Sequence, residues 1–180
     1  MQNRLITLAV AAAAIILAAC GGDNSTTTPP VSKIVNFSAT LTPAGEPGTL
    51  QGNTADAHGT FIAKLDTSTN VFTWNVTFTG LSSNVTAGHI HGPFVPGGSA
   101  TSASVILNFA SVPGGTLTTG ATTGSATGSV TLNASLPLSQ TVNGDSLRKL
   151  LLAGQVYANI HTTNNGAGEI RGQIAISQQP

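Results

Sequence analysis

Apolar and polar side chains alternate strictly through residues 71–79, VFTWNVTFT. Phe72, Trp74, Val76 and Phe78 occupy every second position, and threonine or asparagine lies between them. Because successive side chains of a strand point to opposite faces, this segment is predicted to be a strand with one buried face. Weaker patterns of the same kind, separated by turn-forming residues, predict further strands at Ile34–Leu41, Gly59–Leu65, Val85–His91, Ser104–Phe109, Gly128–Ala134, Gln155–His161 and Glu169–Ile176.

One segment has helical spacing instead. Residues Asp145–Ala153 place Leu147, Leu150 and Leu151 on one face, begin with an acidic residue and end before Gly154. About eight strands with a single short helix predict an all-β fold, either an antiparallel sandwich or a flattened barrel.

If the last two predicted strands form a hairpin, their apolar patterns restrict the register in which they can pair. Pairing residues whose numbers sum to 330 places Ile160 opposite Ile170, so that the apolar side chains share one face. A shift by one residue would bring Asn159 opposite Ile170 and mix the two faces. The first register therefore predicts a polar ladder on the other face, with the pairs His161–Glu169 and Asn159–Arg171.

The amino-terminal residues have the pattern of an export signal. Residues 5–19 are almost wholly apolar, a length that suits a signal-peptide core better than a membrane span. Residues 17–20, LAAC, resemble the lipobox of bacterial lipoproteins, which implies cleavage before Cys20 and lipidation of that cysteine. An ordinary signal peptide that leaves a free thiol is the alternative. By analogy with such signals, Gly21 after the cysteine favours the outer membrane.

Three segments follow from these patterns. Residues 1–19 are expected to be the signal peptide, residues 20–32 the lipidated cysteine with a flexible tether, and residues 33–180 one folded β domain. The tether is rich in glycine, serine, threonine and proline and has no apolar periodicity. The protein is thus expected to be exported and anchored by lipid in the bacterial envelope, with the membrane reached through Cys20.

Composition narrows the function classes. Six acidic residues balance six basic ones, and charged residues are 7% of the chain, so a basic footprint for nucleic acid is absent. The single cysteine allows no internal disulfide, and packing alone must hold the fold. The chain has no glycine-rich phosphate loop, no nucleophile motif and too few carboxylates to suggest a glycosidase pair. No catalytic residue is therefore assigned.

The segment GHIHG at residues 88–92 carries the candidate chemistry. His89 and His91 are two apart and point to the same side of their predicted strand. With His161 from a neighbouring strand they would bind Cu²⁺ or Zn²⁺ and leave one coordination position open, provided that the three nitrogens lie within roughly 4 Å. Alternatively, each imidazole bonds loop backbone and holds residues 92–103 against the sheet. His58 is expected to be a solvated turn residue.

Three motifs also carry a family resemblance. GLSSNVTAGHIHGP at residues 80–93, LLAGQVYANIHT at 151–162 and GEIRGQI at 168–174 resemble, as a set, the CHRD domain, the module named after chordin. The resemblance spans roughly residues 34–177. It implies an extracellular or exported domain with an immunoglobulin-like β fold, partly through a distant likeness to copper–zinc superoxide dismutases. Chordin binds growth factors, whereas the bacterial relatives have no assigned activity.

The dismutase likeness can be followed residue by residue. His89, His91 and His161 resemble copper-ligating histidines, and Arg171 resembles the arginine that draws the anion to the copper. Residues 92–144, however, contain no histidine, aspartate or glutamate, so the dismutase zinc site cannot be built. The resemblance therefore favours a non-catalytic binding or interaction module of the envelope. A copper- or zinc-binding protein is the alternative, and dismutase activity is not expected.

Overall fold

The computed structural model describes residues 33–97 and 101–177. Its elements, in chain order, are β1 (Ile34–Leu41), the 3₁₀ turn η1 (Pro43–Gly45), β2 (His58–Asp66), β3 (Val71–Thr79), β4 (Val85–His91), β5 (Val105–Asn108), β6 (Thr116–Leu117), β7 (Gly124–Thr131), α1 (Gly144–Leu152), β8 (Tyr157–Thr162), β9 (Ile170–Gln173) and β10 (Ala175–Ile176). The signal peptide, Cys20 and tether predicted for residues 1–32 lie outside the described residues.

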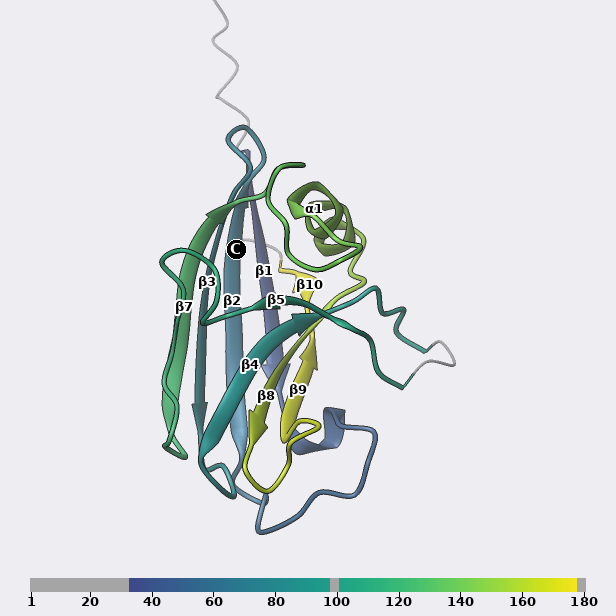
Figure 1. The fold of residues 1–180 in the computed structure, drawn as a ribbon. Coiled ribbons are helices and arrows are strands. Elements are labelled where there is room, and N and C mark those ends of the chain that lie inside the picture. Colours follow the sequence, from purple (N-terminus) through teal and green to yellow (C-terminus); the bar gives the residue numbers. More distant parts are fainter. Residues whose placement is uncertain (1–32, 98–100, 178–180) are drawn as a thin grey trace, which may run out of the picture. The chain divides into compact units, whose positions relative to one another are not determined.

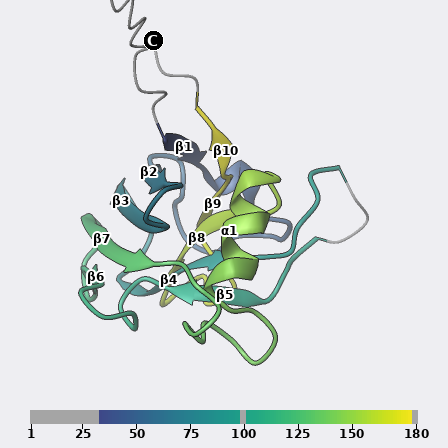
Figure 2. The same cartoon turned by 90° about the horizontal axis from the view of Figure 1, so that it is seen from above.

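The strands form two antiparallel sheets that pack as a sandwich (Figure 1). The larger sheet has the order β10-β1-β2-β3-β7-β6, and the smaller has the order β5-β4-β8-β9. Both sheets are open, so the flattened-barrel alternative is wrong and the sandwich is confirmed. The view along the sandwich shows α1 beside the end of the layers (Figure 2).

The period-two pattern of β3 buries one face of that strand, as predicted. Phe72, Trp74, Val76 and Phe78 are each at most 4% exposed. Trp74 contacts Phe109, which directly follows β5 of the smaller sheet, with the two ring centroids 6.2 Å apart. These aromatic contacts place the hydrophobic core between the two sheets, which leaves the outer face of the smaller sheet available for polar side chains.

The helix α1 begins and ends close to its predicted bounds. The Asn143 side chain caps its first turn by accepting a hydrogen bond from the Ser146 backbone N–H at 2.9 Å. Gly154, with a φ of +65°, follows the helix and takes a backbone conformation that favours glycine. Leu147 and Leu151 are fully buried, so the helix covers part of the core. No helix among the residues described has the length and apolar character needed to cross a membrane.

The C-terminal hairpin has the register that the sequence predicts. Ile160 pairs with Ile170 and Asn159 pairs with Arg171, in an antiparallel ladder of β8 and β9. The ladder ends at Ile160–Ile170, so the predicted pair of His161 with Glu169 does not form. The bounds of some strands also differ from the prediction. The final strand is divided into β9 and β10, β7 begins at Gly124 and not at Gly128, and the two-residue β6 has no apolar period from which to predict it.

Candidate metal centre

The three candidate histidines lie together on the outer face of the smaller sheet. His89 and His91 come from β4, and His161 comes from β8, which pairs with β4. Ile90 and Ile160 are fully buried on the core side, so alternation along each strand turns the histidines away from the core. The antiparallel register places Ala87 opposite His161, which brings residues more than 70 positions apart to one spot.

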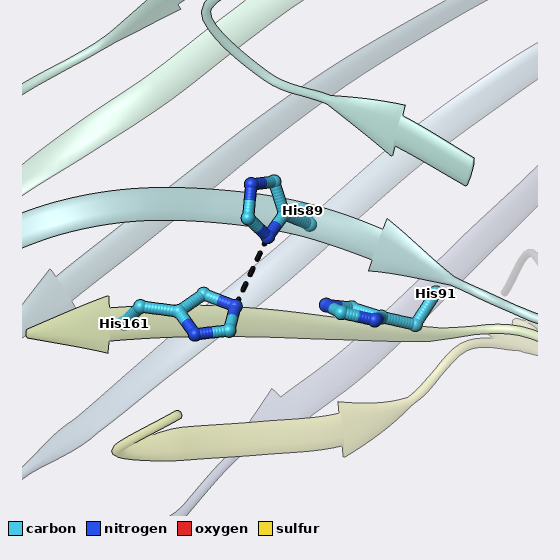
Figure 3. Close-up of side chains that lie close together, drawn as sticks. All are labelled: His89, His91 and His161. Carbon is cyan, nitrogen blue, oxygen red and sulfur yellow. Dashed lines mark hydrogen bonds between the residues drawn. The ribbon is translucent and has the colours of Figure 1, made fainter. Parts of the chain in front are cut away.

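The ring nitrogens of the triad converge (Figure 3). His89 Nδ1 lies 3.0 Å from His161 Nε2. One ring nitrogen from each of His89, His91 and His161 lies within 4.8 Å of the other two. That spacing is wider than the roughly 4 Å expected from the sequence. Nitrogens at metal–nitrogen bonds of about 2.0 Å in a tetrahedral site would lie about 3.3 Å apart. The His89–His161 pair already has about this spacing, and the widest pair would have to close by at most about 1.5 Å.

Backbone carbonyls fix the tautomers of two of the rings. His91 Nδ1 lies 2.9 Å from Ala103 O, and His161 Nδ1 lies 3.0 Å from Gly166 O. Because a carbonyl can only accept, each Nδ1 carries the proton and each Nε2 keeps its lone pair. His91 Nε2 is buried and has no hydrogen-bond partner within the described part of the chain. An unpaired buried acceptor is costly, and a metal ion would satisfy it.

The remaining ring, His89, is the third member of the candidate ligand set. Because His161 Nδ1 carries a proton, His161 Nε2 accepts a hydrogen bond from the Nδ1–H of His89. If an ion displaces that proton, His89 can hold its hydrogen on Nε2 and offer Nδ1. The ligand atoms would then be His89 Nδ1, His91 Nε2 and His161 Nε2. All three are neutral imidazole nitrogens, the donor type that Cu²⁺ and Zn²⁺ prefer.

The electrostatics keep the triad neutral. Burial, together with the neighbouring His161 and His91, lowers the pKa of His89 to about 4. Burial also lowers the pKa of His91, more than the hydrogen bond to Ala103 raises it, and His161 and Arg171 nearby lower it further. The pKa of His161 is likewise lowered by burial, although the hydrogen bond to Gly166 raises it. Neutral imidazoles at neutral pH are ready to bind a metal without first losing a proton to solvent.

The structure contains elements of both predictions made for these histidines. The bond from His91 to Ala103 does hold the end of the 92–103 loop against the sheet, as the structural alternative requires. It uses only Nδ1, however, and leaves Nε2 for a ligand role. His58 lies at the start of β2 with an exposed side chain, and its Nδ1 lies 2.8 Å from Asp56 O. It takes no part in the cluster.

Glu169 does not belong to the polar ladder predicted for the outer face. It is fully buried, and its carboxylate accepts hydrogen bonds from Ser82 N–H and Oγ–H, Thr162 Oγ1–H and Asn165 Nδ2–H at 2.5–3.0 Å. Burial raises the pKa of Glu169, but these hydrogen bonds outweigh it and lower the pKa below its usual value. Because neighbours of His161 at Thr162 and Asn165 supply donors, the carboxylate turns to them and away from His161.

Asn159 and Arg171, the other members of the ladder, lie beside the triad at a cavity of about 350 Å³. Asn159 Nδ2 donates to Glu46 Oε1 at 2.7 Å. Burial raises the pKa of Glu46 to about 7, although the charge of Arg171 and the bond from Asn159 lower it. The guanidinium of Arg171 lies 4.5 Å from the ring centroid of Tyr157. Arg171 therefore stacks on an aromatic ring.

Sequence reasoning missed the groups that orient the triad. Ala103 and Gly166 act through backbone carbonyls, and such contacts leave no trace in residue type. Glu46 lies more than 100 positions from Asn159 and has no motif around it. The period of two does put Tyr157 on the same face as Asn159 and His161, and Tyr157 pairs with Gln173 in the register that sums to 330.

Comparisons with known proteins give one match. The family model described as CHRD domain matches residues 37–174, which is most of the chain and nearly all of the described part. Neither the comparison with curated proteins nor that with solved structures found a match. The matched range contains the whole triad, and the three motifs that carry the resemblance lie within it. The chain belongs to the CHRD domain family.

Proposed function

We propose that the domain is a non-catalytic binding module whose triad of His89, His91 and His161 holds a transition-metal ion, either Cu²⁺ or Zn²⁺. The observation that carries the proposal is the convergence of three ring nitrogens to within 4.8 Å on a sheet face. Histidines on an ordinary protein surface are solvated, and water satisfies their ring nitrogens. Here His91 and His161 are only 7% and 8% exposed, and His91 Nε2 has no hydrogen-bond partner among the described residues.

The donor set favours borderline metals. Three neutral imidazoles suit Cu²⁺ and Zn²⁺, and intrinsic affinity follows the order in which Cu²⁺ exceeds Zn²⁺. Three protein ligands leave a coordination position for water or another ligand. Among residues 33–97 and 101–177 only this one group of three or more histidine, cysteine or acidic side chains is found. A second metal beside the first, as in the copper–zinc dismutases, therefore has no ligands there, and we do not propose dismutase activity.

Envelope anchoring is the second part of the proposal. It is supported by the LAAC sequence at residues 17–20 and by the polar segment that separates it from β1. Lipidation at Cys20 would hold the domain at a membrane surface, since acyl chains contribute about 0.8 kcal/mol for each buried methylene. In that setting the module would bind its metal, or an envelope partner, outside the cytoplasm.

Metal analysis tests the binding function directly. The protein should be expressed without a histidine tag, stripped with a chelator, and equilibrated with equimolar Cu²⁺ or Zn²⁺ before gel filtration. We expect one equivalent of metal to co-elute with wild-type protein. Less than about 0.1 equivalent of either metal, with the fold intact by circular dichroism, would overturn the proposal and leave the triad a structural cluster.

A further inference from the structure

Tyr157 contacts both the His91 ring and Ala103, the residue to which His91 is hydrogen-bonded. It lies in β8 directly opposite His91 of β4. The two rings are parallel to within 2°, with centroids 4.9 Å apart. The Tyr157 hydroxyl accepts a hydrogen bond from the Ala103 backbone N–H at 3.1 Å. Ala103 is also the residue whose carbonyl accepts the proton of His91 Nδ1 at 2.9 Å.

In this set of three groups, each group contacts the other two. His91 bonds Ala103, Ala103 bonds the Tyr157 hydroxyl, and the Tyr157 ring stacks on His91. Moving any one of the three breaks a contact with both of the others. A hydrogen bond from His91 to the Ala103 carbonyl alone would leave the loop free to shift, whereas the tyrosine hydroxyl also holds the N–H of Ala103 to a central strand of the sheet.

Arg171 supports Tyr157 from the opposite side. It lies in β9, and β8 runs between β9 and β4, so Arg171 and His91 flank the Tyr157 ring. The guanidinium carbon is 4.5 Å from the ring centroid, at the distance of a cation–π contact. Its Nη1–H donates to Thr101 O at 2.9 Å, two residues before Ala103. Tyr157 and Arg171 therefore bind the same short loop segment to the sheet.

The consequence lies in the position of one proton. Neutral imidazole can carry its hydrogen on either nitrogen, and the hydrogen bond of the other nitrogen decides which. If the Ala103 carbonyl moves away, His91 can hold its proton on Nε2. That nitrogen then faces the triad as a donor and cannot bind a metal. Direct partners of metal-binding histidines typically contribute about 10- to 100-fold in metal affinity.

We infer that Tyr157 is a positioning residue for the metal centre: it holds the Ala103 carbonyl that keeps the proton of His91 on Nδ1. Arg171 has the supporting role of fixing the Tyr157 ring and the 101–103 segment. The significance of this arrangement for metal binding rests on the proposed function. The tautomer of His91 does not, because it is a property of the metal-free protein.

Tyr157→Phe tests the inference, since it removes the hydroxyl and keeps the stacked ring. Long-range ¹H–¹⁵N NMR of the metal-free protein at pH 7 should show the Nδ1–H tautomer of His91 in the wild type and a mixture of tautomers in the variant. Zn²⁺ affinity should fall about 3- to 10-fold, less than the loss of a direct partner. Thr60→Val, which removes a hydroxyl from the exposed face of the larger sheet, should leave tautomer and affinity unchanged.

An unchanged His91 tautomer in Tyr157→Phe would overturn the inference. If wild-type protein binds no Zn²⁺, the proposed function fails, but the tautomer comparison still decides the role of Tyr157. Should Tyr157→Phe fold poorly, Arg171→Gln provides the second variant. It removes the contact with the Tyr157 ring, and we expect the His91 tautomer to shift in the same direction by a smaller amount. No shift there would also contradict the inference.

Discussion

His89 Nδ1 and His161 Nε2 lie 3.0 Å apart, although 72 positions separate the two residues in the chain. The contact exists only because β4 and β8 are neighbours in the smaller sheet. The candidate ligand set is therefore a product of the folded sandwich, and an unfolded chain would offer at most the His89–His91 pair at close range.

Metal affinity should depend on pH less steeply than in a peptide with the same histidines. The folded-state pKa of His89 is about 4, and those of His91 and His161 are lowered as well. Between pH 7 and pH 6, three histidines with ordinary pKa values near 6.5 would lose roughly 30-fold in affinity to proton competition. We expect a smaller loss over that range, with the fall in affinity displaced to lower pH. Zn²⁺ titration at pH 7, 6 and 5 measures it; a loss of 30-fold between pH 7 and 6 would show ordinary, solvated histidines.

The fold could be predicted because its strands have simple patterns. In β3 every second residue is apolar and buried, and in the final hairpin a shift by one residue would take Ile160 and Ile170 off a common face. The limits of the prediction are equally physical. The two residues of β6 are too few to show a period, and the glycines and serines of β7 contribute little apolar signal.

Glu169→Gln should destabilise the domain by about 2–3 kcal/mol, because an amide places an N–H₂ group against donors that need an acceptor. The four donors come from Ser82, Thr162 and Asn165, so the carboxylate ties the loop after β3 to the turn after β8. Urea unfolding measures the change. Glu46→Gln is the matched control, since its acceptor role toward Asn159 is kept, and it should cost less than about 1 kcal/mol. Equal effects in the two variants would contradict the account.

Gly128→Ala should destabilise the larger sheet by about 1–3 kcal/mol through overpacking. An ideal Cβ at this position would lie 2.0 Å from Cζ2 of Trp74, the residue that pairs with Gly128. Because Trp74 is the single tryptophan, its fluorescence reports both the local change and global unfolding. Gly48→Ala is the control, with no neighbouring atom within 4 Å of the added carbon. A Gly128→Ala variant as stable as wild type would mean that Trp74 is packed elsewhere.

The candidate site was only partly predictable, for a reason that its residues make clear. Alternation along a strand put His89 and His91 on one face, and His161 was expected from a neighbouring strand, as the resemblance to the dismutases also implied. Nothing in the sequence indicated that Glu169 would turn to Ser82, because that contact depends on the path of two loops. The roles of the Ala103 and Gly166 carbonyls could not be predicted either, because every residue has a backbone carbonyl.

Cys20→Ser should release the protein from the membrane fraction or block its processing, because the serine cannot receive the lipid. The expectation rests on the LAAC sequence at residues 17–20. Fractionation of cells that express either form, followed by immunoblotting, measures it. A variant that partitions with membranes as wild type does would count decisively against a lipid anchor.

The triad itself is best tested by calorimetric titration of tag-free, metal-free protein with Cu²⁺ and Zn²⁺. The wild type should bind one ion, and His89→Ala, His91→Ala and His161→Ala should each weaken binding at least tenfold, because each leaves two ligands. His58→Ala, which alters an exposed histidine outside the cluster, should bind as wild type does. If His91→Ala binds either metal as tightly as wild type, or if His58→Ala causes the larger loss, the three histidines do not form the metal site.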